Sequence, residues 1–178
     1  QEIRQCLADD ELAQKLKDHN VILSTANSLN WVRIVPSIAY YCWAASCLFA
    51  QGRLQWGEGG LALVVPSGNG SELVAAIYAR EMGIPIEKII VTTNRNRGLA
   101  DLIREGSYNR RRKLWHTDLP ALDVDLPMNV ERVLYEVLGR DAVQTSIYLN
   151  DLINEGFIRS SKKDTAAIQS YLDAMSID

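Results

Sequence analysis

Cysteine and histidine are scarce in this chain of 178 residues, which holds three of the first and two of the second. Cys6, Cys42 and Cys47 form no C-x-x-C pair, and His19 and His116 lie far from them and from each other. A structural zinc site needs about four such ligands at short spacings, so we expect no metal site. So few cysteines also exclude a disulfide scaffold and indicate free thiols in a reducing, cytoplasmic setting.

Glycine and proline are also few, at 11 and 5 residues, and no charge sign dominates. With 47% hydrophobic and 23% charged residues, the composition excludes collagen-like and disordered chains and indicates one soluble domain over residues 1–178. The 19 basic and 22 acidic side chains leave a net charge of −3. The basic run Arg110–Lys113 is therefore interpreted as a solvated loop, and no nucleic-acid partner is expected.

Long hydrophobic runs are limited to residues 34–50, which contain Pro36 and two serines. The run is shorter than the roughly 20 residues that a membrane span requires. We therefore expect a buried core helix with Trp31 and Trp43 in the core, and no membrane contact. The N-terminal residues lack the apolar segment of a signal peptide, and the chain starts at Gln1 instead of Met, so we expect residues upstream.

Apolar spacing and capping residues predict an alternation of helices and strands. The expected helices cover residues 9–19, 31–49, 72–82, 99–105, 129–138, 142–155 and 164–174. The expected strands cover residues 21–25, 61–65 and 87–92, with an extended stretch at 114–117. A strand, a turn, a helix and a strand within about 30 residues form a βαβ unit. The pattern predicts an α/β fold, a three-layer open, mostly parallel sheet with helices on both faces.

The turn Ser67-Gly-Asn-Gly-Ser71 lies between a predicted buried strand and a predicted helix. Free backbone N–H groups and the positive helix end can bind a phosphate at such a place. Glycines let the backbone approach the anion closely. Glycine-rich turns also occur only to reverse the chain, so the turn alone leaves both interpretations open.

A second polar segment precedes the most apolar helix. Asn27, Ser28, Asn30 and Arg33 gather amide, hydroxyl and guanidinium donors there. Such groups are satisfied either by capping the helix or by a ligand, and the planar guanidinium suits a phosphate. A helix cap with one surface ion pair is the alternative.

Several segments resemble landmarks of the threonine synthase family, in the same order and over about residues 20–138. Asn27–Tyr41 (NSLNWVRIVPSIAYY) resembles N-S-I-N-W-x-R-I-L-x-Q-I-x-Y-Y, and Val65–Ile86 resembles V-P-T-G-N-F-G-N-I-L-A-G-Y-x-A-x-x-M-G-L-P-I without a gap. Thr93–Asn96 (TNRN) is similar to T-N-E-N, Leu119–Val124 to S-P-A-M-D-I, and Asn129–Arg132 to N-F-E-R.

The resemblance implies part of the large domain of a fold-type II pyridoxal 5′-phosphate (PLP) enzyme, of the tryptophan-synthase β type. The family's reaction is a lyase step of threonine biosynthesis that converts O-phosphohomoserine and water into threonine and phosphate. The resemblance further implies that the PLP phosphate is held by Ser67, Gly68, Asn69, Gly70 and Ser71. It implies that the phosphate of the substrate, a small phosphorylated amino acid, is held by Asn27, Ser28, Asn30 and Arg33.

Two departures from the family pattern matter. Ser71 replaces the second glycine of the family turn, and Glu72 follows it, where an acidic side chain is unfavourable beside a phosphate unless it turns away. The family's lysine motif F-K-D and its S-G-D-T-G motif are absent, and the six lysines present lie in polar surroundings that do not suit covalent catalysis. No catalytic residue is therefore assigned.

The chain is thus expected to be a portion of a longer threonine synthase-like protein and inactive alone. Its partners would be the remainder of its own fold or further copies of itself. The alternative is a non-catalytic phosphate-binding, PLP-binding or partner-docking module derived from that fold.

Overall fold

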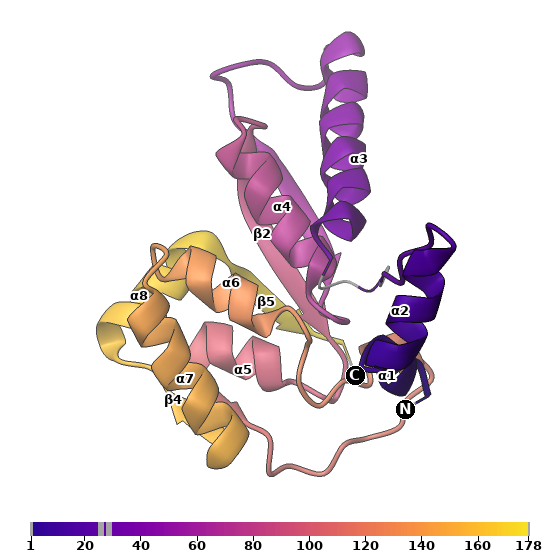
Figure 1. The fold of residues 1–178 in the computed structure, drawn as a ribbon. Coiled ribbons are helices and arrows are strands. Elements are labelled where there is room, and N and C mark those ends of the chain that lie inside the picture. Colours follow the sequence, from indigo (N-terminus) through magenta and orange to yellow (C-terminus); the bar gives the residue numbers. More distant parts are fainter. Residues whose placement is uncertain (1, 25–26, 28–29, 178) are drawn as a thin grey trace.

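The computed structural model describes residues 2–24, 27 and 30–177 (Figure 1). Its helices are α1 (Glu2–Leu7), α2 (Asp10–Asp18), α3 (Trp31–Ala50), α4 (Ser71–Glu81), α5 (Gly98–Glu105), α6 (Val130–Val137), α7 (Ala142–Asn154), α8 (Lys162–Tyr171) and the 3₁₀ turn η1 (Pro120–Leu122). Its strands are β1 (Leu61–Pro66), β2 (Ile86–Thr93), β3 (Ser107–Asn109), β4 (Phe157–Arg159) and β5 (Asp173–Ser176).

The central sheet is parallel and has the strand order β1-β2-β5. Val65 pairs with Val91, which in turn pairs with Ala174. A separate antiparallel pair joins β3 to β4. The predicted α/β class and its parallel sheet are confirmed, as are the strands expected at 61–65 and 87–92.

The end of the chain differs from the sequence prediction. The helix expected over 164–174 ends at Tyr171, and the chain continues into β5 instead of closing in a helix. β5 has the sequence Asp-Ala-Met-Ser, in which a single side chain, Ala174, is buried against the core. Because β5 is short and polar, it lacks the apolar run from which a strand is predicted.

The core lies on one face of the sheet. Val65, Ile89, Val91 and Ala174 are buried there, beneath a layer in which α4 and α5 contact the strands. The opposite face is open, because Val64 on β1 is 62% exposed and Met175 on β5 is 44% exposed. The helical layer that a three-layer arrangement places on this second face does not come from the described part of the chain.

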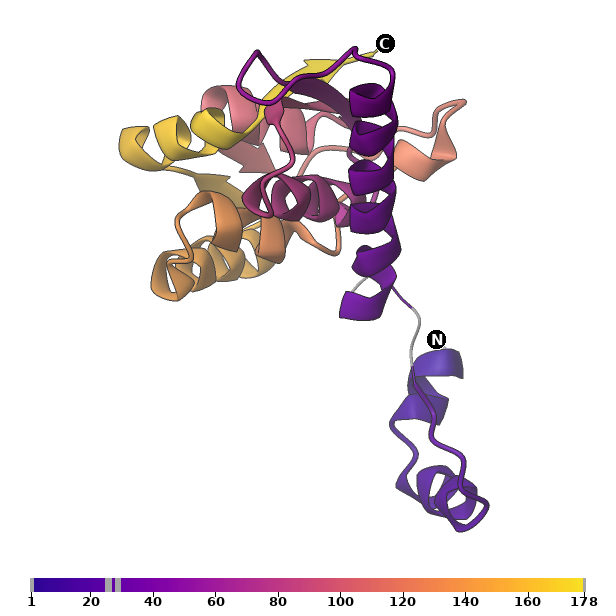
Figure 2. The same ribbon diagram turned by 90° about the horizontal axis from the view of Figure 1, so that it is seen from above.

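The long helix α3 lies beside α4, as Figures 1 and 2 show. The expectation of a core helix is wrong, because only Ile34, Ile38 and Ala45 are buried on it. Trp31 is 51% and Trp43 is 63% exposed. The physical reason is that α3 packs against α4 along one side and exposes its other apolar side.

By length and composition α3 is also the one helix in the described part of the chain that could cross a membrane. Core helices of soluble proteins meet the same criterion. Pairing of α3 with α4 through a polar contact, described below, agrees with a helix that docks on a protein surface.

The N-terminal segment is separate from this body in Figure 2. Asp9 caps α2 by accepting the N–H of Leu12 at 2.9 Å, as expected for the helix over 9–19. The strand expected over 21–25 is wrong for its described residues, since Val21–Ser24 form no regular structure. Their β-branched side chains find no neighbouring strand to pair with, and β propensity alone does not make a strand.

One half-buried tyrosine, Tyr41, and one buried tyrosine, Tyr108, predict an alkaline limit to stability. Burial, helped by the charge of Glu72, raises the pKa of Tyr41 to about 12, and burial raises the pKa of Tyr108 further. Because the folded state holds these protons more tightly than the unfolded state, their stabilisation is complete below about pH 10 and is lost above it. We expect the melting temperature to fall steeply between about pH 10 and 12, and to fall less in Tyr41→Phe and Tyr108→Phe. Thermal denaturation across that range tests this, with Tyr40→Phe on the exposed side of α3 as the control; equal slopes in all variants would contradict it.

Candidate phosphate-binding site

The glycine-rich turn joins the carboxyl end of β1 to the amino end of α4. Ser67 donates its N–H to the carbonyl of Thr92 at 2.8 Å, which fixes the turn to β2. Gly70 donates its N–H to the Ser67 carbonyl at 2.8 Å and closes the loop. Gly68 and Gly70 have φ angles of +36° and +80°, in the region where a side chain is strained. The two glycines are therefore required by the backbone path.

Several N–H groups of this turn remain available. Ser71 donates its N–H to the Asn69 side chain at 3.0 Å, and Val74 donates to the Gly70 carbonyl. No acceptor among the described residues takes the N–H groups of Gly68, Asn69, Glu72 and Leu73. Unpaired donors at the positive end of a helix form an anion site.

Hydroxyl groups flank these donors. Ser67 and Ser71 are both buried at the turn, and Ser71 is the first residue of α4. At the end of the neighbouring strand β2, the hydroxyl of Thr93 is buried without a hydrogen-bond partner among the described residues. A phosphate group accepts hydrogen bonds from both N–H and O–H donors, so the donor set fits it.

Asn129 holds the turn from behind, a role that the sequence did not reveal. Its backbone N–H and its side-chain Nδ2 both donate to the Asn69 carbonyl, at 3.0 and 3.1 Å. Asn129 is 0% exposed, and a Cβ atom on Gly70 would lie 3.3 Å from its own Cβ. These two hydrogen bonds keep the Asn69 carbonyl oxygen, which carries a partial negative charge, directed toward Asn129. The unpaired N–H groups of the turn therefore stay available to a ligand.

Glu72 is engaged by α3. Its carboxylate accepts the Ser37 hydroxyl at 2.9 Å, and its carbonyl accepts the Tyr41 hydroxyl at 3.4 Å. The Glu72 side chain is thus held against α3. An acidic residue after the turn is compatible with a bound phosphate only if it turns away, and Glu72 is held in this way. The same contacts attach α3 to the beginning of α4.

The predicted substrate segment leads into the first turn of α3. Asn30 caps α3 by accepting the Val32 N–H at 3.0 Å, which is the capping alternative. Asn27 accepts the Asn30 N–H through its carbonyl, and Ser28 lies outside the described residues. Arg33 is exposed on the first turn of α3, and no carboxylate in the described ranges pairs with it. Ser37, one helical turn beyond Arg33, makes the contact that reaches α4.

A polar network lies at the carboxyl end of β2. Asp123 accepts the Thr117 N–H and hydroxyl and the Asn94 amide, all at 2.7–2.8 Å. These hydrogen bonds, that of the Thr117 N–H first, lower the pKa of Asp123. Asp125 pairs with Arg110 at 2.8 Å. The described residues contain no cluster of three or more metal-binding side chains.

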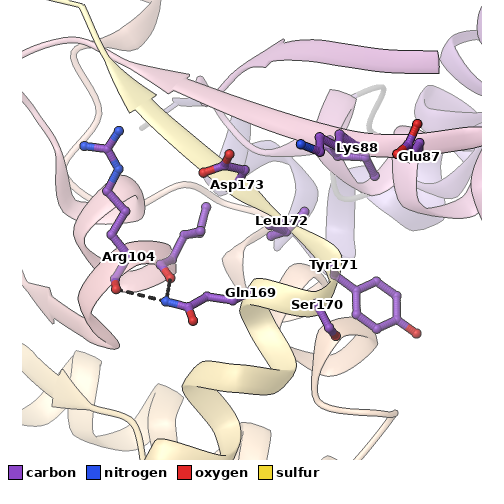
Figure 3. A pocket seen from close by; sticks show the side chains of 10 residues that line it. Glu87, Lys88, Arg104, Gln169, Ser170, Tyr171, Leu172 and Asp173 are labelled. Atoms are coloured by element: carbon purple, nitrogen blue, oxygen red, sulfur yellow. Dashed lines mark hydrogen bonds between the residues drawn. The ribbon is translucent and has the colours of Figure 1, made fainter. Parts of the chain in front are cut away.

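A hollow of about 400 Å³ lies at the amino end of β2, away from the turn (Figure 3). Arg104 donates to the Ala174 carbonyl at 2.8 Å, and Gln169 donates to the carbonyls of Ile103 and Arg104. These side chains attach α5, α8 and β5 to one another. Lys88 lies beside Glu87 on β2 (Figure 3), near the amino end of the strand, whereas the phosphate-binding turn follows the carboxyl end of β1.

Comparison with known proteins gives one consistent set of relatives. No protein-family profile matches the chain. Threonine synthase-like 1 of Homo sapiens is 36% identical over 146 residues, which are 82% of this chain and 20% of that protein. Threonine synthase of Saccharomyces cerevisiae is 35% identical over 133 residues, 75% of this chain and 24% of that protein.

The fold gives the same relatives. The crystal structure of PLP-bound threonine synthase from Brucella melitensis superposes with a TM-score of 0.83 at 32% identity, over 98% of this chain and 35% of that one. Yeast threonine synthase shares the fold with a TM-score of 0.76 at 24% identity, over 99% of this chain and 35% of that one. The chain thus spans about a fifth to a quarter of the length of these curated relatives.

Proposed function

This chain is a relative of threonine synthase and threonine synthase-like proteins, and on that premise we propose that it supplies the phosphate-binding turn of a PLP site. The observation that carries the proposal is the set of unpaired N–H groups at Gly68, Asn69, Glu72 and Leu73. Ser67 and Ser71 would add hydroxyl donors. Bound there, PLP would serve as the electron sink of the reaction.

The chain's own residues would bind and orient this group. The N–H donors at the start of α4 would neutralise the phosphate, and Asn129 would keep the Asn69 carbonyl away from it. Holding the phosphate at a fixed helix end fixes where the remainder of the cofactor lies. Glu72, held by Ser37, would not repel the phosphate.

The substrate would be a small phosphorylated amino acid, O-phosphohomoserine by resemblance. We propose that Asn27, Ser28, Asn30 and Arg33 bind its phosphate group once the rest of the fold, or a second copy, brings them together. Arg33 suits this role because its guanidinium is exposed and has no ion-pair partner in the described part of the chain.

No lysine is assigned to catalysis. None of the hydrogen bonds of residues 67–71 in the described structure involves a lysine. We therefore propose that residues 1–178 form one part of a larger catalytic fold and give no turnover by themselves. A cytoplasmic setting agrees with the three free cysteines.

Binding of pyridoxine 5′-phosphate tests the site, because this compound carries the phosphate but no aldehyde that would react with surface lysines. We expect saturable binding by calorimetry, no binding of pyridoxine without phosphate, and loss of binding in Gly68→Val. The chain incubated with PLP and O-phosphohomoserine should form no threonine above a protein-free blank. Equal affinity of wild type and Gly68→Val would show that the turn does not bind the phosphate. Threonine formation would contradict the proposal that residues 1–178 give no turnover by themselves.

A further inference from the structure

Two cationic side chains converge on a single tryptophan ring at the end of β2. The Arg95 guanidinium lies 4.4 Å and the Lys113 ammonium 5.5 Å from the centroid of the Trp115 ring. Neither cation pairs with a carboxylate in the described ranges of the chain. Each is attracted to the ring, but two like charges so close to one ring repel each other.

The surroundings add positive charge. Arg97 and Arg112 line the same cavity and share one carboxylate, that of Asp101. Asp125 also lines the cavity, but its carboxylate is paired with Arg110. The cavity therefore carries an excess of positive charge in a chain whose net charge is −3.

The backbone of Trp115 is held in a fixed position. Asn96 accepts the Trp115 backbone N–H at 2.8 Å and donates to the Trp115 backbone carbonyl at 2.9 Å. Asn96 is itself bonded to Asp123 at 3.1 Å, within the polar network described above. The residue that carries the ring is thus fixed through its backbone, which lowers the entropic cost of binding a ligand beside it.

We propose that Arg95 and Lys113 bind a phosphate group above the Trp115 ring, at a site separate from the glycine-rich turn. An anion between the two side chains would replace their mutual repulsion with two charge-assisted contacts. The cavity has a volume of about 50 Å³. That is room for one or two water molecules, so a phosphate group would lie only partly inside the cavity, and a nucleobase would not fit.

The site includes a departure from the family landmark T-N-E-N. Arg95 occupies the position where the T-N-E-N landmark has a glutamate. A carboxylate beside Trp115 would repel an anion. An arginine at this position instead of a glutamate therefore allows an anion to bind. The site follows β2 and its loop, whereas the turn follows β1, so the proposal stands even if the turn binds nothing.

The indole N–H signal of Trp115 in a proton–nitrogen correlation spectrum reports on this site. The four indole signals are assigned with Trp115→Phe, and inorganic phosphate is titrated at low ionic strength. We expect a saturable shift of the Trp115 signal. Its apparent affinity should fall at least tenfold in the double variant Arg95→Gln/Lys113→Gln.

The matched control is Arg53→Gln/Lys88→Gln, which removes the same charges at two exposed positions elsewhere and should change the affinity less than twofold. Gly68→Val should leave the Trp115 shift intact, which separates this site from the turn. A Trp115 signal unmoved by phosphate, or equal affinities in the two double variants, would overturn the proposal. A shift produced by RNA but not by phosphate would overturn it as well.

Discussion

Valine in place of Gly70 should abolish binding of pyridoxine 5′-phosphate and lower the free energy of unfolding by about 2–4 kcal/mol. Gly70 has φ +80°, a conformation in which a β-branched side chain is strained. Its new Cβ would also lie 3.3 Å from the Cβ of Asn129, a buried atom that cannot withdraw. The turn must then shift, and its N–H groups lose their common direction.

Gly139→Val is the matched control for this prediction. Gly139 follows α6 with φ +71°, and a Cβ built on it meets no atom within 4 Å. The two variants share the backbone strain, and only Gly70→Val disturbs the turn. Urea unfolding and calorimetric titration of both variants test this. Loss of binding in Gly139→Val as well would show that general destabilisation, not turn geometry, controls the affinity.

The parts of the site that the sequence predicts are those that depend on neighbours in the chain. The turn between 67 and 71 follows from an apolar strand, two glycines and a helix in immediate succession. A cap at the start of α3 is equally local, and Asn30 provides it. Asn129 belongs to a segment that resembles a family landmark. Its contact with Asn69 could not be predicted, because the two residues are 60 positions apart and no local sequence pattern indicates the pairing.

The prediction for α3 failed for a different reason. An apolar sequence indicates that a helix surface avoids water, but it does not indicate what covers that surface. Here α4 covers the side of Ile34, Ile38 and Ala45, while Trp43 stays exposed. β5 was missed because a strand with one buried side chain is defined by its pairing with β2, which the local sequence does not encode.

The open sheet face is a result of the same kind. Burial alternates along β1, so one face of the sheet is buried and the other is open, whereas the sequence expectation assigned helices to both faces. The described residues cover one. The chain matches 35% of the length of the Brucella melitensis structure, so most of that structure has no counterpart among residues 1–178.

Aspartate in place of Asn129 should destabilise the fold at neutral pH by about 2–3 kcal/mol and weaken phosphate binding at least tenfold. The substitution keeps the size of the side chain and the backbone N–H bond to Asn69, but it replaces the Nδ2 donor with a carboxylate oxygen facing a carbonyl oxygen. Asn69 would turn its carbonyl away from this repulsion and toward the ligand. Arg132, which donates to the Asn129 side chain at 3.4 Å, would offset part of the cost.

The pH dependence of this variant separates positioning from simple loss of packing. The introduced carboxylate should be easier to protonate in the folded protein than in the unfolded chain, because it is buried against a carbonyl. Once protonated it can donate to Asn69, so the deficit relative to wild type should shrink as the pH falls from 8 to 5. Asn129→Ala lacks a titrating group and should show a deficit that does not depend on pH.

Thr145→Val on α7 is the control for burial alone, since Thr145 is buried and donates to the Asp141 carbonyl far from the turn. It should cost about 1 kcal/mol and leave the affinity for pyridoxine 5′-phosphate unchanged. If Asn129→Asp unfolds and binds like wild type at both pH 8 and pH 5, the side-chain hydrogen bond from Asn129 to Asn69 does not set the direction of the turn. If its affinity recovers in acid together with its stability, the Asn129 side chain positions the phosphate-binding N–H groups.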